Sequence, residues 1–334
     1  MSARFDIIGI GNAIVDVVAP VEDSFLSRRD MRKGTMTLID AAAAEALYRA
    51  IPPGRESSGG SAANTCAVAA ALGARVAYLG KVADDQLGQV FRHDIEAAGV
   101  RFPSSPLRGG APTARCMILV TPEGQRTMHT YLGACVAFGE SDVDEALAAD
   151  AAILYLEGYL FDPPAAQAAF RRAAATAHRA GRQVALSLSD PFCVDRHRAA
   201  LRDLVRLEVD ILFANEAELA SLYETNALTD AIERARGEVG LAAITRSEAG
   251  SIIVRGGETV ELSAEPTTVI DTTGAGDAYA AGFLAGLAQG RPLALCGRLG
   301  GIAAAEIISH YGARPESDLM ALATAAGMAS IQTG

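Results

Sequence analysis

Residues 267–290 read TTVIDTTGAGDAYAAGFLAGLAQG, and this stretch decides how the rest of the chain is interpreted. It begins with a β-branched run, 267–270, which predicts a short buried strand. The part that follows the glycines at 274–276 is helical in composition up to Gly290. The glycines therefore lie where a strand is expected to give way to a helix. The free N–H groups and positive dipole of a helix N-terminus suit an anion such as phosphate.

Asp277 follows these glycines. A carboxylate beside a phosphate site would repel the phosphate, so its presence there needs a specific explanation. One explanation is that it accepts the proton of a hydroxyl group that attacks a phosphoryl group. The helix N-terminus favours the ionised carboxylate, so Asp277 is expected to accept that hydrogen bond at neutral pH. The alternative is structural: a first-turn acid that interacts with the helix dipole, beside glycines that only allow close packing.

Composition limits the class of protein. The chain has 334 residues, half of them hydrophobic, which suits one large α/β domain or two ordinary ones. Its net charge is −11 without any Lys/Arg-rich run, which argues against nucleic acid or an anionic membrane as the main partner. Five scattered cysteines without CxxC spacing indicate neither a zinc site nor a disulfide framework. Without a signal-peptide pattern or a bilayer-length apolar stretch, the sequence predicts a soluble cytosolic protein.

From residue 151 onward, apolar strands alternate with helical segments. This alternation predicts an α/β fold with a mostly parallel central sheet and helices on both faces. Ligands bind such sheets at the carboxyl ends of the strands. Five residues are expected at that edge: Gly158, Asp190, Asn215, Thr245 and Asp271. The second half of the chain is therefore predicted to carry a catalytic face.

The first half contains two further candidate ligand sites. Residues 5–19 read as two strands with Asn12 and Asp16 among apolar residues, and the missing third glycine of the GIG pattern excludes a Rossmann dinucleotide motif. The two polar side chains suit a polyhydroxylated ligand, although a plain backbone turn also explains them. Residues 57–64 read SSGGSAAN and begin a second, small-residue helix. Its small residues suit either close approach of a ligand or tight helix packing.

Three loops have two interpretations each. Arg126 follows the turn of a predicted hairpin in 108–133, where it is either a solvated charge or a group that reaches over a phosphate. Asn215 and Glu218 suit a water-bridged Mg²⁺ site or a helix capping box. Residues 245–250 join two strands and form either a plain hairpin or a loop that wraps the phosphates of a nucleotide.

Four motifs in chain order resemble the ribokinase-like carbohydrate and nucleoside kinases, the PfkB family, over essentially the whole chain. These are GGSAAN at 59–64, NEAE at 215–218, the loop 245–250, and DTTGAGDAYAAGF at 271–283. GIGNAIVD at 9–16 and LSDPF at 188–192 are most similar to the adenosine kinases. Two positions depart from the family pattern. Ser247 replaces a glycine of the nucleotide loop, and Asp190 stands where adenosine kinases usually have a small residue.

The resemblance implies an enzyme that transfers the γ-phosphoryl group of ATP to a primary hydroxyl of a ribose-containing nucleoside, such as adenosine to AMP in purine salvage. The alternatives are a kinase of another sugar (ribose, fructose or 2-keto-3-deoxygluconate) and a non-catalytic nucleoside- or sugar-binding protein. The implied cofactors are ATP, Mg²⁺ and a monovalent cation such as K⁺. A monomer or a homodimer without nucleic-acid or membrane partners is expected.

The resemblance also implies roles for single residues. Asp277 is the base, and the anion hole is formed by Gly274, Ala275 and Gly276. The acceptor is held by Asn12, Asp16, Gly59, Gly60 and Asn64. Tyr159 and Phe192 are candidates for the apolar walls that would contact the nucleobase of a nucleoside. The nucleotide is held by Asn215, Thr245, Arg246, Ser247 and Gly250, together with Gly274 and Gly276. Mg²⁺ is assigned to Glu218 and Asn215, and the monovalent cation to Asp271 and Thr273.

The implied fold is a ribokinase-like α/β/α sandwich with a small β-sheet lid, in a single kinase chain, 1–334. The large domain is expected to comprise about 1–15, 41–107 and 136–334, and the lid about 16–40 and 108–135. Such a lid closes over the sugar and excludes water, which otherwise competes as phosphoryl acceptor.

Overall fold

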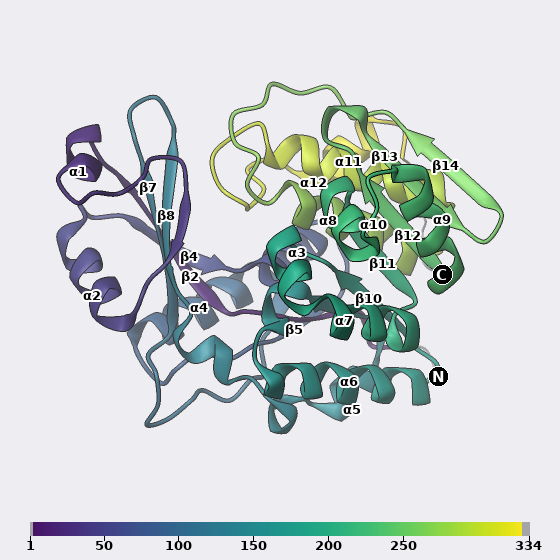
Figure 1. Ribbon diagram of the computed structural model, residues 1–334, viewed down its shortest axis with the longest axis horizontal. Helices are drawn as coiled ribbons and strands as arrows, with labels where there is room; N and C mark the ends of the chain where they lie inside the picture. The colour runs from purple at the N-terminus through teal and green to yellow at the C-terminus, as the bar shows by residue number, and fades with distance from the viewer. Residues whose placement is uncertain (1–2, 329–334) are drawn as a thin grey trace.

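The computed structural model describes residues 3–328, which are organised around two β-sheets (Figure 1). The larger sheet has nine strands in the order β14-β13-β12-β11-β10-β9-β1-β5-β6. Neighbours from β6 to β12 run parallel, and β13 and β14 are added antiparallel, which confirms the predicted mostly parallel sheet. The strands are β1 (Phe5–Ile10), β5 (Val76–Leu79), β6 (Val100–Arg101), β9 (Ala151–Glu157), β10 (Gln183–Ser187), β11 (Ile211–Asn215), β12 (Leu241–Thr245), β13 (Ser251–Arg255) and β14 (Glu258–Leu262).

Helices cover both faces of this sheet. Successive residues of a strand point to opposite faces, so each strand contributes side chains to the hydrophobic core on either side. Ile7 and Ile8 of β1, for example, belong to two different hydrophobic cores. One core is covered by α3 (Ser61–Ala71), α4 (Gln86–Ala97), α10 (Ala275–Ala288), α11 (Leu293–Ile307) and α12 (Leu319–Ala325). The other is covered by α5 (Glu145–Ala149), α6 (Pro164–Arg179), α7 (Pro191–Glu208), α8 (Glu216–Tyr223) and α9 (Leu228–Glu238). Within residues 3–328, no helix combines the length and the apolar character needed to cross a bilayer.

The smaller sheet stands to one side of the large one (Figure 1, left) and has the order β3-β8-β7-β2-β4. Its strands are β2 (Ile14–Pro20), β3 (Met36–Leu38), β4 (Arg55–Gly59), β7 (Ala114–Val120) and β8 (Arg126–Tyr131). Helices α1 (Asp23–Ser27) and α2 (Ala41–Ala50) contribute Leu26, Ala44 and Leu47 to a separate small core with this sheet. The structure thus adds β4 to the smaller sheet, from residues that the sequence analysis assigned to the large domain.

The strand predicted at 267–270 is wrong. These residues form no strand, and Val269 and Ile270 are 58% and 48% exposed. The large sheet ends at β14, so the chain returns toward α10 along the surface. The Ile270 N–H donates to the carbonyl of Ile308, just past the end of α11, at 2.8 Å. β-branched composition alone thus does not make this run a strand, because strand propensity depends on packing against neighbouring strands.

Candidate active site

A cavity of about 710 Å³ separates the smaller sheet from the carboxyl ends of the large sheet's strands. Glu157, Ser187, Asn215 and Thr245 line it from the ends of four neighbouring strands. This matches the expectation that ligand-binding residues of a parallel sheet gather at one edge. Of the five residues predicted at that edge, Asp190, Asn215 and Thr245 line the cavity, whereas Gly158 and Asp271 do not.

The N-terminus of α10 faces this cavity. Gly274, Ala275 and Gly276 line it, and Gly274 is the N-cap residue with φ +80°. A side chain at Gly274 would be strained in this left-handed conformation, and its Cβ would lie 2.7 Å from the Cβ of Ala313. The first-turn N–H groups of a helix lack intrahelical acceptors. The structure thus brings Gly274, Ala275 and Gly276 to the cavity at the start of α10, although the segment before them is a loop and not a strand. The Ala275 N–H donates to the carbonyl of Thr272 at 3.2 Å.

Asp277 lies in the first turn of α10 and also lines the cavity. Its Oδ1 accepts a hydrogen bond from the Ser61 hydroxyl at 2.6 Å, and its Oδ2 accepts one from the Asn64 amide at 3.4 Å. Burial raises the pKa of Asp277 to about 6, and these two hydrogen bonds oppose the rise. Burial thus outweighs the helix end, which was expected to favour the ionised form. The carboxylate remains largely ionised at neutral pH.

The acceptor residues predicted in the first half of the chain lie on the same cavity. Asn12, Asp16, Gly60 and Asn64 line it, whereas Gly59 does not. Gly59 instead makes room, because a Cβ there would collide with the Asp16 carboxylate. Burial raises the pKa of Asp16 to about 6, and the positive charges of Arg314 and Arg126 oppose that rise.

The register of the smaller sheet arranges its inner face. Asp16 pairs with Cys116, Cys116 with Thr130, and Thr130 with Leu38, and all four residues line the cavity. Residues directly opposite each other in a sheet share a face. The sheet thus presents one charged residue, Asp16, at the start of the row, and the Thr130 hydroxyl in the same row donates to the Cys116 sulfur at 3.2 Å.

Glu157, at the end of β9, is a site residue that sequence reasoning missed. Its carboxylate accepts hydrogen bonds from the backbone N–H groups of Asn12 and Ala62 and from the Asn12 side-chain amide at 2.8 Å. Burial raises the pKa of Glu157 to about 7, and these hydrogen bonds oppose the rise. The available signal was an acid that ends an apolar strand one residue before Gly158, where the sequence analysis considered only the glycine.

Arg314 is the second missed residue, and it lies partly buried beside the start of α3. Its guanidinium donates to the carbonyls of Ala63 and Ser58 at 3.0 and 2.7 Å and to the Ser58 hydroxyl at 2.8 Å. It thereby fixes the backbone on both sides of Gly59 and Gly60. Since no motif surrounds it, the sequence offered no signal for this role.

Asn215 and Glu218 form the capping box that was one of their two interpretations. The Asn215 side chain accepts from the Glu218 N–H at 2.9 Å, and the Glu218 carboxylate accepts from the Asn215 N–H at 2.9 Å. Burial raises the pKa of Glu218 to about 7. Both residues also line the cavity. The capping box therefore holds a carboxylate at the cavity wall.

The loop after β12 reaches the cavity only through Thr245. Arg246, Ser247 and Gly250 form a tight turn outside the cavity lining. Ser247 has φ +50°, the left-handed conformation that glycine adopts readily. The replacement of glycine by Ser247 therefore leaves a glycine-like backbone in place.

Tyr159 and Phe192, the candidate contacts of a nucleobase, both line the cavity, and Phe192 is 72% exposed. Asp190, the other departure from the family pattern, is the N-cap of α7 and accepts a hydrogen bond from the Phe192 N–H at 2.6 Å. This bond fixes the start of α7, where Phe192 lies. The charge of Asp190 thus has a structural function at this position.

Asp271 and Thr273 are hydrogen-bonded to each other, but only one of them reaches the cavity. Thr273 lines the cavity, whereas Asp271 is turned away from it and pairs with Arg126. Arg126 is therefore neither solvated nor free to reach a phosphate in this arrangement. Within residues 3–328, no group of three or more His, Cys, Asp or Glu side chains is placed to hold a metal ion.

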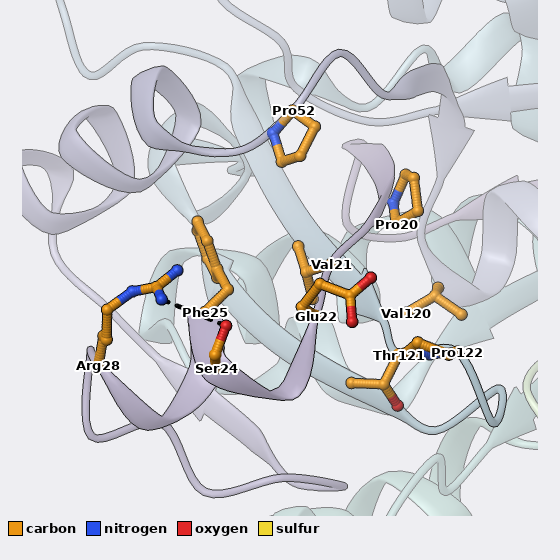
Figure 2. A pocket seen from close by; sticks show the side chains of 10 residues that line it. All are labelled: Pro20, Val21, Glu22, Ser24, Phe25, Arg28, Pro52, Val120, Thr121 and Pro122. Atoms are coloured by element: carbon orange, nitrogen blue, oxygen red, sulfur yellow. Dashed lines mark hydrogen bonds between the residues drawn. The ribbon is translucent and has the colours of Figure 1, made fainter.

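A second cavity, of about 570 Å³, lies beside α1 at one end of the smaller sheet (Figure 2). Its lining combines prolines and valines with Phe25 and Glu22, and Arg28 donates to the Ser24 hydroxyl at 3.2 Å. It contains none of the glycine-rich helix starts that surround the first cavity. The first cavity is therefore the candidate active site.

Known proteins are similar to this chain in sequence and in overall fold. The model of the pfkB family carbohydrate kinases matches residues 36–319. The chain belongs to this family. An adenosine kinase structure from Sinorhizobium meliloti is 51% identical with a TM-score of 0.89, covering 97% of this chain and 100% of that one. A probable sugar kinase from Rhizobium etli CFN 42 is 48% identical with a TM-score of 0.90, covering 98% and 100%. The adenosine kinase of Saccharomyces cerevisiae is 28% identical over 86% of this chain and 90% of its own length.

As a pfkB-family kinase, the chain is a phosphotransferase that acts on hydroxyl groups of sugars or nucleosides. Kinases of this family use ATP and typically Mg²⁺. Phosphoryl transfer depends mainly on positioning and on stabilising charge. The N-terminus of α10 can stabilise charge on a phosphoryl group, and the Asp277 carboxylate in its first turn can position an attacking hydroxyl.

Proposed function

We propose that this kinase phosphorylates the primary hydroxyl of a ribose-containing nucleoside, with adenosine converted to AMP. The observation that carries the proposal is a pair of apolar walls on opposite sides of the cavity. Met36 and Leu38 on the smaller sheet are each more than half exposed, and Tyr159 and Phe192 line the cavity from the large domain. A flat nucleobase fills such a space, since aromatic rings gain most from stacking against apolar surfaces. A free sugar would leave these side chains in contact with water.

The acceptor sugar is assigned to the polar end of the cavity. The Asn12 Oδ1 is buried and has no hydrogen-bond partner among the described residues. A buried acceptor of this kind is satisfied when a ligand hydroxyl donates to it. Asp16, Gly60 and Asn64 line the same end and supply further acceptors and donors.

The transfer step follows from the position of Asp277. Its carboxylate accepts the proton of the acceptor hydroxyl while the hydroxyl oxygen forms a bond to the γ-phosphorus. The bond from the γ-phosphorus to the bridging oxygen breaks, and ADP leaves with that electron pair. The N–H groups of Gly274, Ala275 and Gly276 stabilise the charge on the transferred phosphoryl oxygens.

Mg²⁺ is assigned to Glu218 and Asn215 through water. The Glu218 oxygens already accept hydrogen bonds from the N–H and the side-chain amide of Asn215, at 2.9 and 2.7 Å. This donor set fits a Mg²⁺ ion that arrives with ATP and keeps most of its water, and it does not fit an all-protein cage. When bound, the ion neutralises charge on the phosphates.

The decisive experiment is an acceptor screen with ATP and Mg²⁺. Adenosine, cytidine, ribose, fructose and 2-keto-3-deoxygluconate are compared by kcat/KM. A nucleoside is expected to rank first, because only a nucleoside occupies both ends of the cavity. A higher value for a free sugar would replace the nucleoside assignment. ATP-independent binding without turnover would favour a non-catalytic nucleoside- or sugar-binding protein.

The activity is expected to depend on pH. Asp277 accepts a proton only when it is ionised, and its pKa is raised to about 6 by burial. The value of kcat/KM for the best acceptor is therefore expected to fall as the pH decreases through about 6, and to level off above about 7. Initial rates between pH 5 and pH 8 test this, with thermal unfolding at each pH as the control for acid denaturation. A flat profile down to pH 5 would contradict the assignment.

The smaller sheet is expected to act as a lid. It forms one wall of the cavity, and its apolar inner residues Met36 and Leu38 are exposed. Backbone hydrogen exchange in 108–135 is expected to slow when the acceptor and a non-hydrolysable ATP analogue bind together. The helix α6 provides an internal reference whose exchange should not change. Equal protection of 108–135 with and without ligands would argue against closure.

A further inference from the structure

Arg126 connects the smaller sheet to the loop that precedes α10. It is the first residue of β8, and its Nη1 lies 2.7 Å from the Asp271 Oδ2. Each of the two side chains is only 8% exposed. The ring of Tyr311 lies 5.6 Å from the guanidinium carbon and covers it further. A positive charge carried by the smaller sheet is thus held a few residues before the anion hole.

The Asp271 carboxylate has its oxygens engaged on both sides. Its Oδ1 accepts hydrogen bonds from the N–H and the hydroxyl of Thr273, at 3.1 and 2.8 Å. Its Oδ2 accepts from the Gly312 N–H at 3.1 Å and faces Arg126. A free monovalent cation needs several oxygen ligands that are not already bound to donors. A carboxylate oxygen has about two lone pairs, so Oδ2 has none left for a cation while both Gly312 and Arg126 occupy it. With Arg126 in place, Asp271 and Thr273 therefore do not fit the cation site that the family resemblance implied for them.

We propose that the Arg126 guanidinium takes the place of a monovalent cation beside Asp271, so that this kinase neither binds K⁺ there nor depends on it. The inference rests on the proposed function, because it concerns the charge balance near the proposed anion hole. Since β8 belongs to the smaller sheet, this positive charge is in place only while that sheet covers the cavity. Arg126 is thus a positioning residue that acts through Asp271.

The contact between Arg126 and Asp271 is an ion pair in which the guanidinium makes few hydrogen bonds. The guanidinium nitrogens of Arg126 have no aligned hydrogen-bond acceptor within residues 3–328. A buried ion pair with unfilled donors adds little to folding stability. Removing Arg126 nevertheless leaves the buried Asp271 charge uncompensated, which is expected to lower the Tm, so the informative readout is the dependence of the Tm on K⁺ and not its absolute value.

The test compares thermal unfolding and turnover in KCl and in choline chloride at equal ionic strength. The wild-type protein is expected to have the same Tm and the same kcat in both salts. Arg126→Gln is expected to lose about tenfold in kcat in choline chloride, as one charge-stabilising interaction is removed. In KCl its Tm is expected to rise by about 2 °C, because K⁺ now binds beside the uncompensated Asp271. Arg126→Lys keeps the charge and is expected to remain insensitive to K⁺.

Arg49→Gln, an exposed substitution on α2 that removes a pair with Glu45, is the matched control and should show neither effect. A K⁺-dependent rise in the wild-type Tm overturns the proposal, and so does an Arg126→Gln protein whose Tm ignores K⁺. The wild-type comparison decides alone if Arg126→Gln does not fold. The unfolding experiment contains no substrate, so a failed acceptor screen would not be confused with failure of this inference.

Discussion

Asp277→Asn is expected to fold, to bind ATP and acceptor, and to lose between about 10² and 10⁴ of its kcat. The physical reason is the geometry of one helix turn. The anion hole at 274–276 fixes the phosphoryl group, so the next side chain into the cavity, Asp277, faces the attacking oxygen. Asparagine has nearly the same shape and still accepts from the Ser61 hydroxyl. It does not take up the proton of the acceptor.

The stability of the same variant separates this role from a structural one. Burial raises the pKa of Asp277 to about 6 from 3.8, so its ionised form opposes folding. The free energy of unfolding contributed by this group therefore decreases as the pH rises from about 4 to about 6, and it stays low above that. Asparagine carries no such penalty, so Asp277→Asn is expected to unfold at the same or a higher temperature at pH 7.

A residue that only interacts with the helix dipole would behave in the opposite way. Its substitution would lower stability by about 0.3–1 kcal/mol and leave turnover nearly unchanged. Both quantities are measured on one preparation, with Asp144→Asn, the same substitution at the N-cap of α5, as control. Turnover near the wild-type level together with a lowered Tm would show that Asp277 takes no part in the reaction.

The sequence predicted the fold where local pattern and packing agree. The parallel strands from β9 to β12 are continuous apolar runs followed by polar residues, and such runs have few alternatives to a buried sheet. The run 267–270 is β-branched but half threonine, and it forms no strand. Strand propensity reports packing against a neighbouring strand, and the large sheet already ends at β14.

The candidate site was predictable only where its residues lie in motifs. Asp277 and Asn64 come from glycine-rich helix starts far apart in the chain, and their side chains meet in the structure. Glu157 and Arg314 act through long-range hydrogen bonds to backbone groups near Asn12 and Gly60. Contacts of this kind depend on tertiary packing and leave no local pattern. The pairing of Arg126 with Asp271 is invisible for the same reason, since 145 positions separate the two residues.

Asp16→Ala is expected to raise the KM of the best acceptor by about 10²–10⁴ and to leave the KM of ATP within about twofold. Asp16 lies on the inner face of β2, with its carboxylate above Gly59. Burial raises its pKa to about 6, so it is largely ionised at pH 7 and acts only as an acceptor. Two sugar hydroxyls that donate to it form charge-assisted hydrogen bonds, each worth about 1.5–3 kcal/mol. Since 1.4 kcal/mol corresponds to about tenfold, their joint loss gives the stated range.

The comparison of the two substrates decides what Asp16 does. Asp16 belongs to the smaller sheet, whereas the residues assigned to the nucleotide lie at the ends of β11 and β12 and at α10. A loss confined to the acceptor is therefore the result of a missing ligand contact. Asp16→Asn serves as the matched variant, because it keeps the shape and one acceptor oxygen, and it is expected to raise the acceptor KM by less. Initial rates with both substrates varied give both constants. If the two KM values rose equally, Asp16 would support the smaller sheet and would not bind the sugar.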